Sequence, residues 1–230
     1  MASFHLIRYD SARAMRHMAF DRPLLRRAGG LLFWRLLGTG RGRAMSLGAD
    51  LRRWALFAVW RGEDDLDAFL RTSPIAARWR AEAAEHWQVR LAPTASRGAW
   101  SGRDPFAGSL GGGRAAAALG AGPVAVLTRA SIRPSRLVAF YRSVPRVDEL
   151  LRRQDGCLAS IGVGEWPLAR QATFSLWRDR EAVRSFAYRG EAHRQVIERV
   201  RAHDWYAEEL FARFTPYASE GAWDGADPLR

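Results

Sequence analysis

The chain has 230 residues and a formal net charge of +12, which arises from 36 arginines, no lysine and 24 acidic residues. Its hydrophobic content of 48% excludes a disordered chain and suits one large domain or two small domains packed together. The single cysteine, Cys157, excludes an internal disulfide, and we find neither a signal-peptide pattern nor an apolar run long enough to span a membrane. We therefore expect a cytoplasmic protein, whose positive charge reflects either a codon bias toward arginine or an acidic partner.

The first half of the chain predicts alternating strands and helices. Hydrophobic patterning indicates strands at 4–9, 54–60 and 88–92 and helices at 11–25 and 64–85. A glycine-flanked segment before residue 54 has room for one more strand. With that strand, the order becomes β-α-β-β-α-β, which is the ferredoxin-like unit.

The second half repeats this order. Strands are expected at 124–130, 171–177 and 210–214, and helices at 134–153 and 180–202. The sequences Gly38-Thr39-Gly40 and Gly162-Val163-Gly164 fall at corresponding places in the two halves. Neither is followed by the third glycine and helix of a dinucleotide-binding fold, so we expect bulges or turns there.

An internal repeat supports the same division. Residues 93–106 align with 216–229, and nine of the fourteen positions are identical. Residues 55–61 also align with 172–178. The repeat predicts a tandem duplication of two α+β ferredoxin-like halves that form a barrel-like fold within one chain. The halves are 1–108 and 123–230, joined by a Gly/Ala-rich linker at 109–122.

The repeat also serves as an internal control for function, because a buried polar residue found in only one half is a candidate functional residue. A weaker match pairs Leu6 and Arg8 with Leu127 and Arg129, so both arginines are treated as possible structural residues.

His193 is the strongest candidate. On a helix it shares an apolar face with Ile197 and Val200, and its counterpart in the first half is Ala76. Two interpretations stay open, a haem axial ligand and a buried histidine bonded to a backbone carbonyl. The carboxylates are scattered rather than paired, which favours a bound cofactor over self-contained acid–base chemistry.

Several stretches resemble the spheroidene monooxygenase family of carotenoid ketolases. They are LFWRLLGTG (32–40), GPVAVLTRASIRP (122–134), IGVGEWPL (161–168), WYAEELFARF (205–214) and GAWDG (221–225). The resemblance implies a haem b oxygenase that uses dioxygen and electrons from reduced ferredoxin. Its substrate would be an apolar small molecule, an acyclic carotenoid that is hydroxylated and converted to a ketone.

The family resemblance also implies a fold and a ligand. The fold is the dimeric α/β barrel of chlorite dismutases and aldoxime dehydratases, in which a helix of the C-terminal half supplies the proximal histidine. Only His193 fits that place in this sequence. Candidates for distal groups that polarise bound oxygen are Arg8, Arg129, His5 and Ser160.

Three further expectations follow. The positive surface would dock an acidic ferredoxin. The basic, apolar stretch 26–43 either contacts a membrane peripherally or forms an ordinary helix and loop packed on the sheet. Nucleic-acid binding is not expected, since the arginines are dispersed and no binding module is recognisable. A haem lyase or dehydratase of the aldoxime dehydratase kind, and a non-catalytic protein that binds haem or an apolar ligand, remain alternatives, and the oligomeric state is open.

Overall fold

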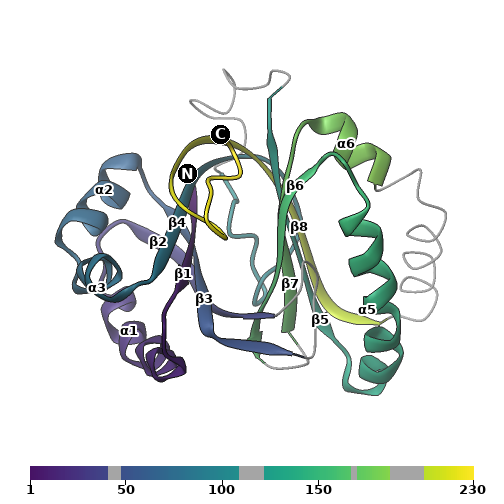
Figure 1. The fold of residues 1–230 in the computed structure, drawn as a ribbon, viewed down its shortest axis with the longest axis horizontal. Coiled ribbons are helices and arrows are strands. Elements are labelled where there is room, and N and C mark those ends of the chain that lie inside the picture. The colour runs from purple at the N-terminus through teal and green to yellow at the C-terminus, as the bar shows by residue number, and fades with distance from the viewer. Residues whose placement is uncertain (41–47, 109–121, 167–169, 187–204) are drawn as a thin grey trace.

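The structure is a computed structural model, and it describes residues 1–40, 48–108, 122–166, 170–186 and 205–230 (Figure 1). In the first half the elements are β1 (Ala2–Arg8), η1 (Ala12–Arg16), α1 (His17–Arg26), β2 (Leu31–Gly40), β3 (Ala49–Trp60), α2 (Glu63–Thr72), α3 (Pro74–Glu82) and β4 (Glu85–Gly98). In the second half they are β5 (Val124–Ile132), η2 (Pro134–Arg136), α5 (Leu137–Arg152), β6 (Cys157–Trp166), β7 (Arg170–Trp177), α6 (Arg180–Arg184) and β8 (Tyr206–Gly221). Each half therefore has the expected β-α-β-β-α-β order.

The eight strands form one closed antiparallel barrel in the order β1-β3-β2-β6-β7-β5-β8-β4. The two halves join along two seams, a long ladder between β4 and β8 and a short one between β2 and β6. Helices α1 to α3 cover the outside of the first half, and α5 and α6 cover the outside of the second (Figure 1). This confirms the predicted barrel of two ferredoxin-like units. No helix of the described residues is long and apolar enough to cross a bilayer.

Two local expectations need correction. The helix expected at 64–85 is divided, because the Ser73 hydroxyl accepts hydrogen bonds from the N–H groups of Ile75 and Ala76 and starts α3 with Pro74 in its first turn. The stretch 26–43 is not a helix and loop. Most of its described part is the barrel strand β2, which pairs with β3 along its whole length.

The Gly-x-Gly sequences lie where β2 meets β6. Gly38 pairs with Gly164, and Thr39 pairs with Val163. The ladders with the neighbouring strands shift register immediately after Gly38 and after Gly164. Bulges are therefore confirmed, and these glycines serve the seam between the halves rather than a nucleotide.

Large apolar side chains fill the inside of the barrel. Phe4 of β1 stacks on Phe174 of β7 with ring centroids 4.0 Å apart. Trp100, Phe106 and Phe214 complete the cluster around Phe57, and all are buried. The barrel interior is thus a packed core, which leaves its outer faces and its ends as places for a ligand.

The conserved repeat at 93–106 and 216–229 encodes a pair of matching turns. Ser101 and Gly102 follow β4 in the left-handed region and donate their backbone N–H groups to the Glu208 carboxylate. Asp224 and Gly225 follow β8 in the same conformation and donate to Glu85. The repeated Trp-x-Gly sequence is therefore structural, and each turn is held by a carboxylate from the other half of the barrel.

Candidate functional site

The sheet register changes the repeat match that the sequence indicated for Arg129. Leu6 lies between Ala55 and Trp87 on the neighbouring strands, whereas Arg129 lies between Ala172 and Leu210. The match of 55–61 with 172–178 makes Ala55 equivalent to Ala172. The match of 93–106 with 216–229, extended back along the same strand, makes Trp87 equivalent to Leu210. Arg129 therefore occupies the position of Leu6, and its expected match with Arg8 is wrong.

Arg129 is consequently a buried charge found in one half only. Its side chain is 3% exposed, points into the barrel and forms an ion pair with Glu208. A second carboxylate, Glu165 of β6, lies 3.6 Å from its guanidinium, and the ring of Trp100 lies 5.7 Å from its central carbon. Arg35 of β2 completes the group with a 2.5 Å contact to Glu165. Two arginines and two carboxylates therefore balance one another in charge at this place.

A pocket of about 580 Å³ adjoins this charged group at the short seam between β2 and β6. It is lined by Arg22, Trp34, Arg35, Leu36, Ser101, Glu165 and Arg170. Burial lowers the pKa of Arg35, and the neighbouring Glu165 opposes that shift. The pocket therefore offers polar walls on a rim shared by both halves.

The outer faces of the two half-sheets differ in the size of several equivalent side chains. In the first half, one row across three strands consists of His5, Leu56 and Leu36. In the second half, Thr128 stands at the position equivalent to His5, and Thr173, its neighbour on β7, stands at the position equivalent to Leu56. The replacement of histidine and leucine by threonine removes much of the side-chain volume on this face.

One flanking row shows the same trend, because Trp54 on the outer face of β3 corresponds to the smaller Gln171 on β7. In the other flanking row, Ala58 corresponds to Ser175, which adds a hydroxyl group without loss of volume. On β6, next to Ser175, the outer position is Ser160. The outer face of the second half-sheet is therefore lined by small hydroxyl-bearing residues.

Packing above the two faces differs accordingly. In the first half, Trp79 of α3 covers His5 and Trp54, with ring centroids 5.2 and 6.1 Å away, and one continuous apolar cluster results. In the second half, the described residues form two separate clusters, one around Trp177 and one around Phe140. Thr128 is exposed, although the equivalent His5 is completely buried. Among the described residues, the second face thus has a gap that the first face has filled.

His193 lies outside the described residues. The chain on both sides of that segment packs on the outer face of the second half-sheet. Phe186 contacts Trp177 with ring centroids 5.1 Å apart, and Trp205 packs against Phe140 in the other apolar cluster.

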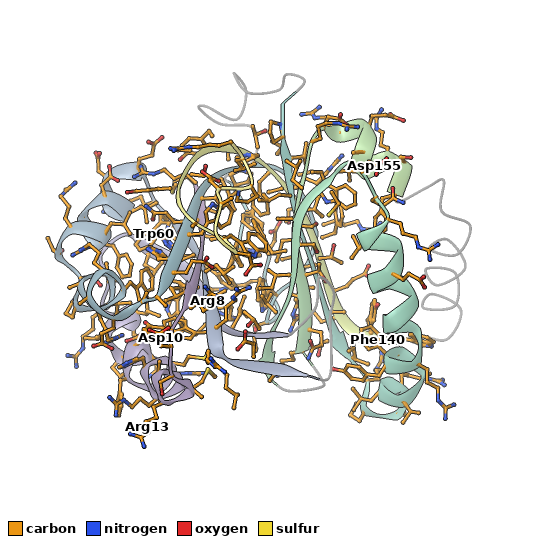
Figure 2. The ribbon with its side chains drawn as sticks, viewed as in Figure 1. Arg8, Asp10, Arg13, Trp60, Phe140 and Asp155 are labelled. Carbon is orange, nitrogen blue, oxygen red and sulfur yellow. The ribbon has the colours of Figure 1, made fainter. Side chains whose placement is uncertain are left out.

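The structure does not bring the four distal candidates together. His5 is buried on the outer face of the first half, where it shares a hydrogen bond of 3.0 Å with Ser3. Arg8 is exposed at the end of β1, and its guanidinium lies 3.8 Å from Glu85 (Figure 2). Arg129 points into the barrel. Only Ser160 lies on the outer face of the second half-sheet, and it is buried there.

Sequence reasoning missed Thr128 and Thr173, which form the floor of the gap. The sequence did contain a signal for Thr173, because it aligns with Leu56 in the match of 55–61 with 172–178. Thr128 was hidden because its equivalence to His5 depends on the sheet register. Among the described residues, no group of three His, Cys, Asp or Glu side chains is placed to bind a metal ion.

Solved structures of two aldoxime dehydratases share the fold of this chain. One has a TM-score of 0.60 at 11% identity and is matched over 94% of this chain and 80% of its own. The other, crystallised with butyraldoxime, also has a TM-score of 0.60 at 11% identity and is matched over 99% and 84%. At this identity the likeness concerns the fold, which is that of the dimeric α/β barrels.

The sequence comparisons are more specific. No family model matches the chain. The spheroidene monooxygenase of Rhodobacter capsulatus is 34% identical over all of this chain and 95% of its own length. That of Rubrivivax gelatinosus is 37% identical over 85% of this chain and 73% of its own, and that of Cereibacter sphaeroides is 34% identical over 86% and 59%. The chain therefore belongs to the spheroidene monooxygenase family.

Proposed function

We propose that this protein is a haem-dependent monooxygenase that oxidises an apolar, carotenoid-type substrate. The observation that carries the proposal is the gap on the outer face of the second half-sheet. Family membership supports a monooxygenase activity, and we place the cofactor at the gap, where threonines replace the Leu56 and His5 that lie under Trp79 in the first half. Haem b is the cofactor that the family resemblance implies.

We assign the axial position to His193. Imidazole is a common axial ligand of haem iron, and the described residues on either side of the segment, Phe186 and Trp205, contact Trp177 and Phe140 of the second half. The haem would supply the chemistry of dioxygen activation. The protein's own residues bind and orient the substrate and exclude water.

Thr128, Thr173 and Ser160 would line the sheet side of this site. Their hydroxyl groups donate and accept hydrogen bonds without carrying charge, which suits polar atoms in an otherwise apolar site. The two apolar clusters would flank the substrate, with Trp177 and Val126 on one side and Phe140 on the other. Apolar walls exclude water from the reacting carbon, which protects an oxidising centre from side reactions.

The net charge of +12 supports reduced ferredoxin, an acidic protein, as the electron donor. Hydroxylation of a C–H bond inserts one atom of dioxygen and releases the other as water, which consumes two electrons and two protons. Two such hydroxylations at one carbon followed by loss of water give a ketone. An external reductant is therefore required, and peripheral contact with a membrane would bring the enzyme to a lipid-dissolved substrate.

The test is the visible absorption spectrum of the protein purified after haem-supplemented expression. We expect a Soret band in the parent that is lost or shifted in His193→Ala. Thr173→Leu introduces the residue that the first half carries, so it should fill the gap and reduce haem uptake. Thr72→Leu makes the same chemical change at an exposed position of α2 and should leave uptake unchanged.

Two results would overturn the proposal. One is a folded parent protein without haem uptake. The other is a Thr173→Leu variant that binds haem as the parent does, because the cofactor then lies elsewhere. A haem-dependent dehydratase is the second candidate, since the fold is shared with aldoxime dehydratases. Oxidation of an acyclic carotenoid that stops when the reductant is omitted separates the two, because dehydration needs no external electrons.

A further inference from the structure

Helix α1 and the preceding η1 expose a row in which two apolar side chains lie between cationic ones, and we call this row the α1 stripe. It consists of Arg13, Arg16, Phe20, Leu24 and Arg27. The successive spacings of three, four, four and three residues place all five along one line of a helix. The Phe20 residue is 64% exposed and Leu24 is 38% exposed, and both rank among the few large apolar residues that the described surface exposes.

The opposite side of α1 already holds the helix on the barrel. Leu25 is 1% exposed, and Ala14 of η1 is buried as well. Asp21 is completely buried and forms an ion pair with Arg78 of α3. Packing therefore accounts for the inner side of α1 and gives no reason for the exposed phenylalanine and leucine of the stripe.

The charge of this region is strongly positive. Arg22 and Arg26 add to the three arginines of the stripe on the other exposed flank of the helix. The acidic residue within α1, Asp21, is neutralised by Arg78. Figure 2 shows Arg13 extending from the outer end of η1, away from the rest of the protein.

We propose that the α1 stripe docks the protein on an anionic lipid surface. Exposed aromatic and aliphatic side chains between arginines are the composition of helices that lie in the membrane interface. The apolar side chains enter the acyl boundary, and the guanidinium groups bind lipid phosphates. The role of this docking in substrate delivery rests on the proposed function, since an apolar polyene resides in lipid.

Co-sedimentation of the full chain with vesicles tests the apolar part. Vesicles of phosphatidylglycerol and phosphatidylcholine are compared with vesicles of phosphatidylcholine alone. We expect binding to the anionic vesicles and a loss of about tenfold or more in Phe20→Ser/Leu24→Ser. The control Leu158→Ser removes an equally exposed leucine, 37% exposed, from the start of β6 and should bind as the parent does.

A second pair of variants tests the charge. Arg13→Gln/Arg16→Gln should weaken binding about tenfold at low salt, because each arginine near an anionic surface contributes several-fold to affinity. The control Arg180→Gln/Arg184→Gln removes two exposed charges from α6, at the other end of the molecule, and should have no effect (Figure 1). Equal loss in both double variants would mean that net charge alone drives binding and would overturn the assignment to the stripe.

The assay needs neither haem nor substrate, so its failure is distinguishable from failure of the proposed function. Absence of binding to anionic vesicles by a folded parent would overturn the lipid proposal. So would the finding that Arg13→Gln/Arg16→Gln weakens a complex with reduced ferredoxin but not binding to vesicles, because the stripe would then be a protein-docking surface. Circular dichroism of each variant establishes that it is folded.

Discussion

Acidification from pH 7.5 to pH 5 should destabilise the protein through two histidines beneath α3. His5 and His86 lie 5.9 Å apart, and the ring of Trp79 is 5.2 Å from each. Burial holds the pKa of His5 well below its usual range, and the neighbouring His86 and Arg90 add to that shift. Burial likewise lowers the pKa of His86 to about 4, with Glu220 opposing and Arg80 supporting the shift.

The sign follows from proton binding. Below pH 6.5 these histidines are protonated in the unfolded chain but stay neutral in the folded protein. The free energy of unfolding therefore decreases as the pH decreases. The stabilisation that the neutral, buried His86 contributes is complete above its unfolded pKa of about 6.5. It is lost progressively as the pH falls toward 4. At pH 5 the difference in protonation is worth about 2 kcal/mol for His86. The lowered pKa values of the Glu208 and Asp227 carboxyls take effect only below this range.

Urea denaturation followed by tryptophan fluorescence measures this effect. The variant His86→Phe keeps an aromatic ring against Trp79 and removes the titrating group. We expect the loss of stability between pH 7.5 and pH 5 to be about 2 kcal/mol smaller in the variant than in the parent. Histidines elsewhere cancel in this difference. An equal pH dependence in parent and variant would refute the reasoning, because His86 would then titrate alike in the folded and unfolded states.

Two further predictions concern the ends of the barrel. Arg129→Leu should destabilise the protein by about 2–3 kcal/mol in urea denaturation. The cost is lower than that of leaving a buried charge with no partner at all, because Glu208 keeps the backbone N–H donors of Ser101 and Gly102. A variant as stable as the parent would contradict the assigned ion pairs. Gly98→Ala should cost at least about 2 kcal/mol more than Gly102→Ala in the same assay. Both glycines have positive φ, but they differ in space: at Gly98 an added Cβ would lie 2.1 Å from the carbonyl oxygen of Glu209, whereas at Gly102 it would meet nothing within 4 Å. Equal costs of the two substitutions would refute the steric argument.

The fold was predictable because its evidence is local and repeated. The identity between 93–106 and 216–229 encodes two turns of the same geometry, and it predicts two similar halves. The division of the helix expected at 64–85 was also predictable. Ser73 followed by Pro74 is a helix start signal within that segment.

The candidate site was less predictable, because its main feature is a difference between the halves that depends on register. A shift of two residues in the match between β1 and β5 keeps every side chain on its own face, so alternation could not reveal the error. That shift hid the equivalence of Arg129 to Leu6 and of Thr128 to His5. Only the pairing of both strands with their neighbours identifies which residues occupy the same place.

The duplication explains how one chain can hold both a rigid half and a candidate site. On the outer face of the first half, Trp54, Trp60 and Trp79 pack around His5 and fill the place that corresponds to the gap. Among the residues that the structure describes, the second half lacks comparable packing above Thr128, which lowers the stability that these residues can supply by themselves. The long β4–β8 ladder and the shared barrel interior bind the two halves into one barrel, so the packed half can support the half that carries the site. A ferredoxin-like unit with the second half's outer face would lack this support as an isolated chain, which is a physical reason for keeping both copies in one polypeptide.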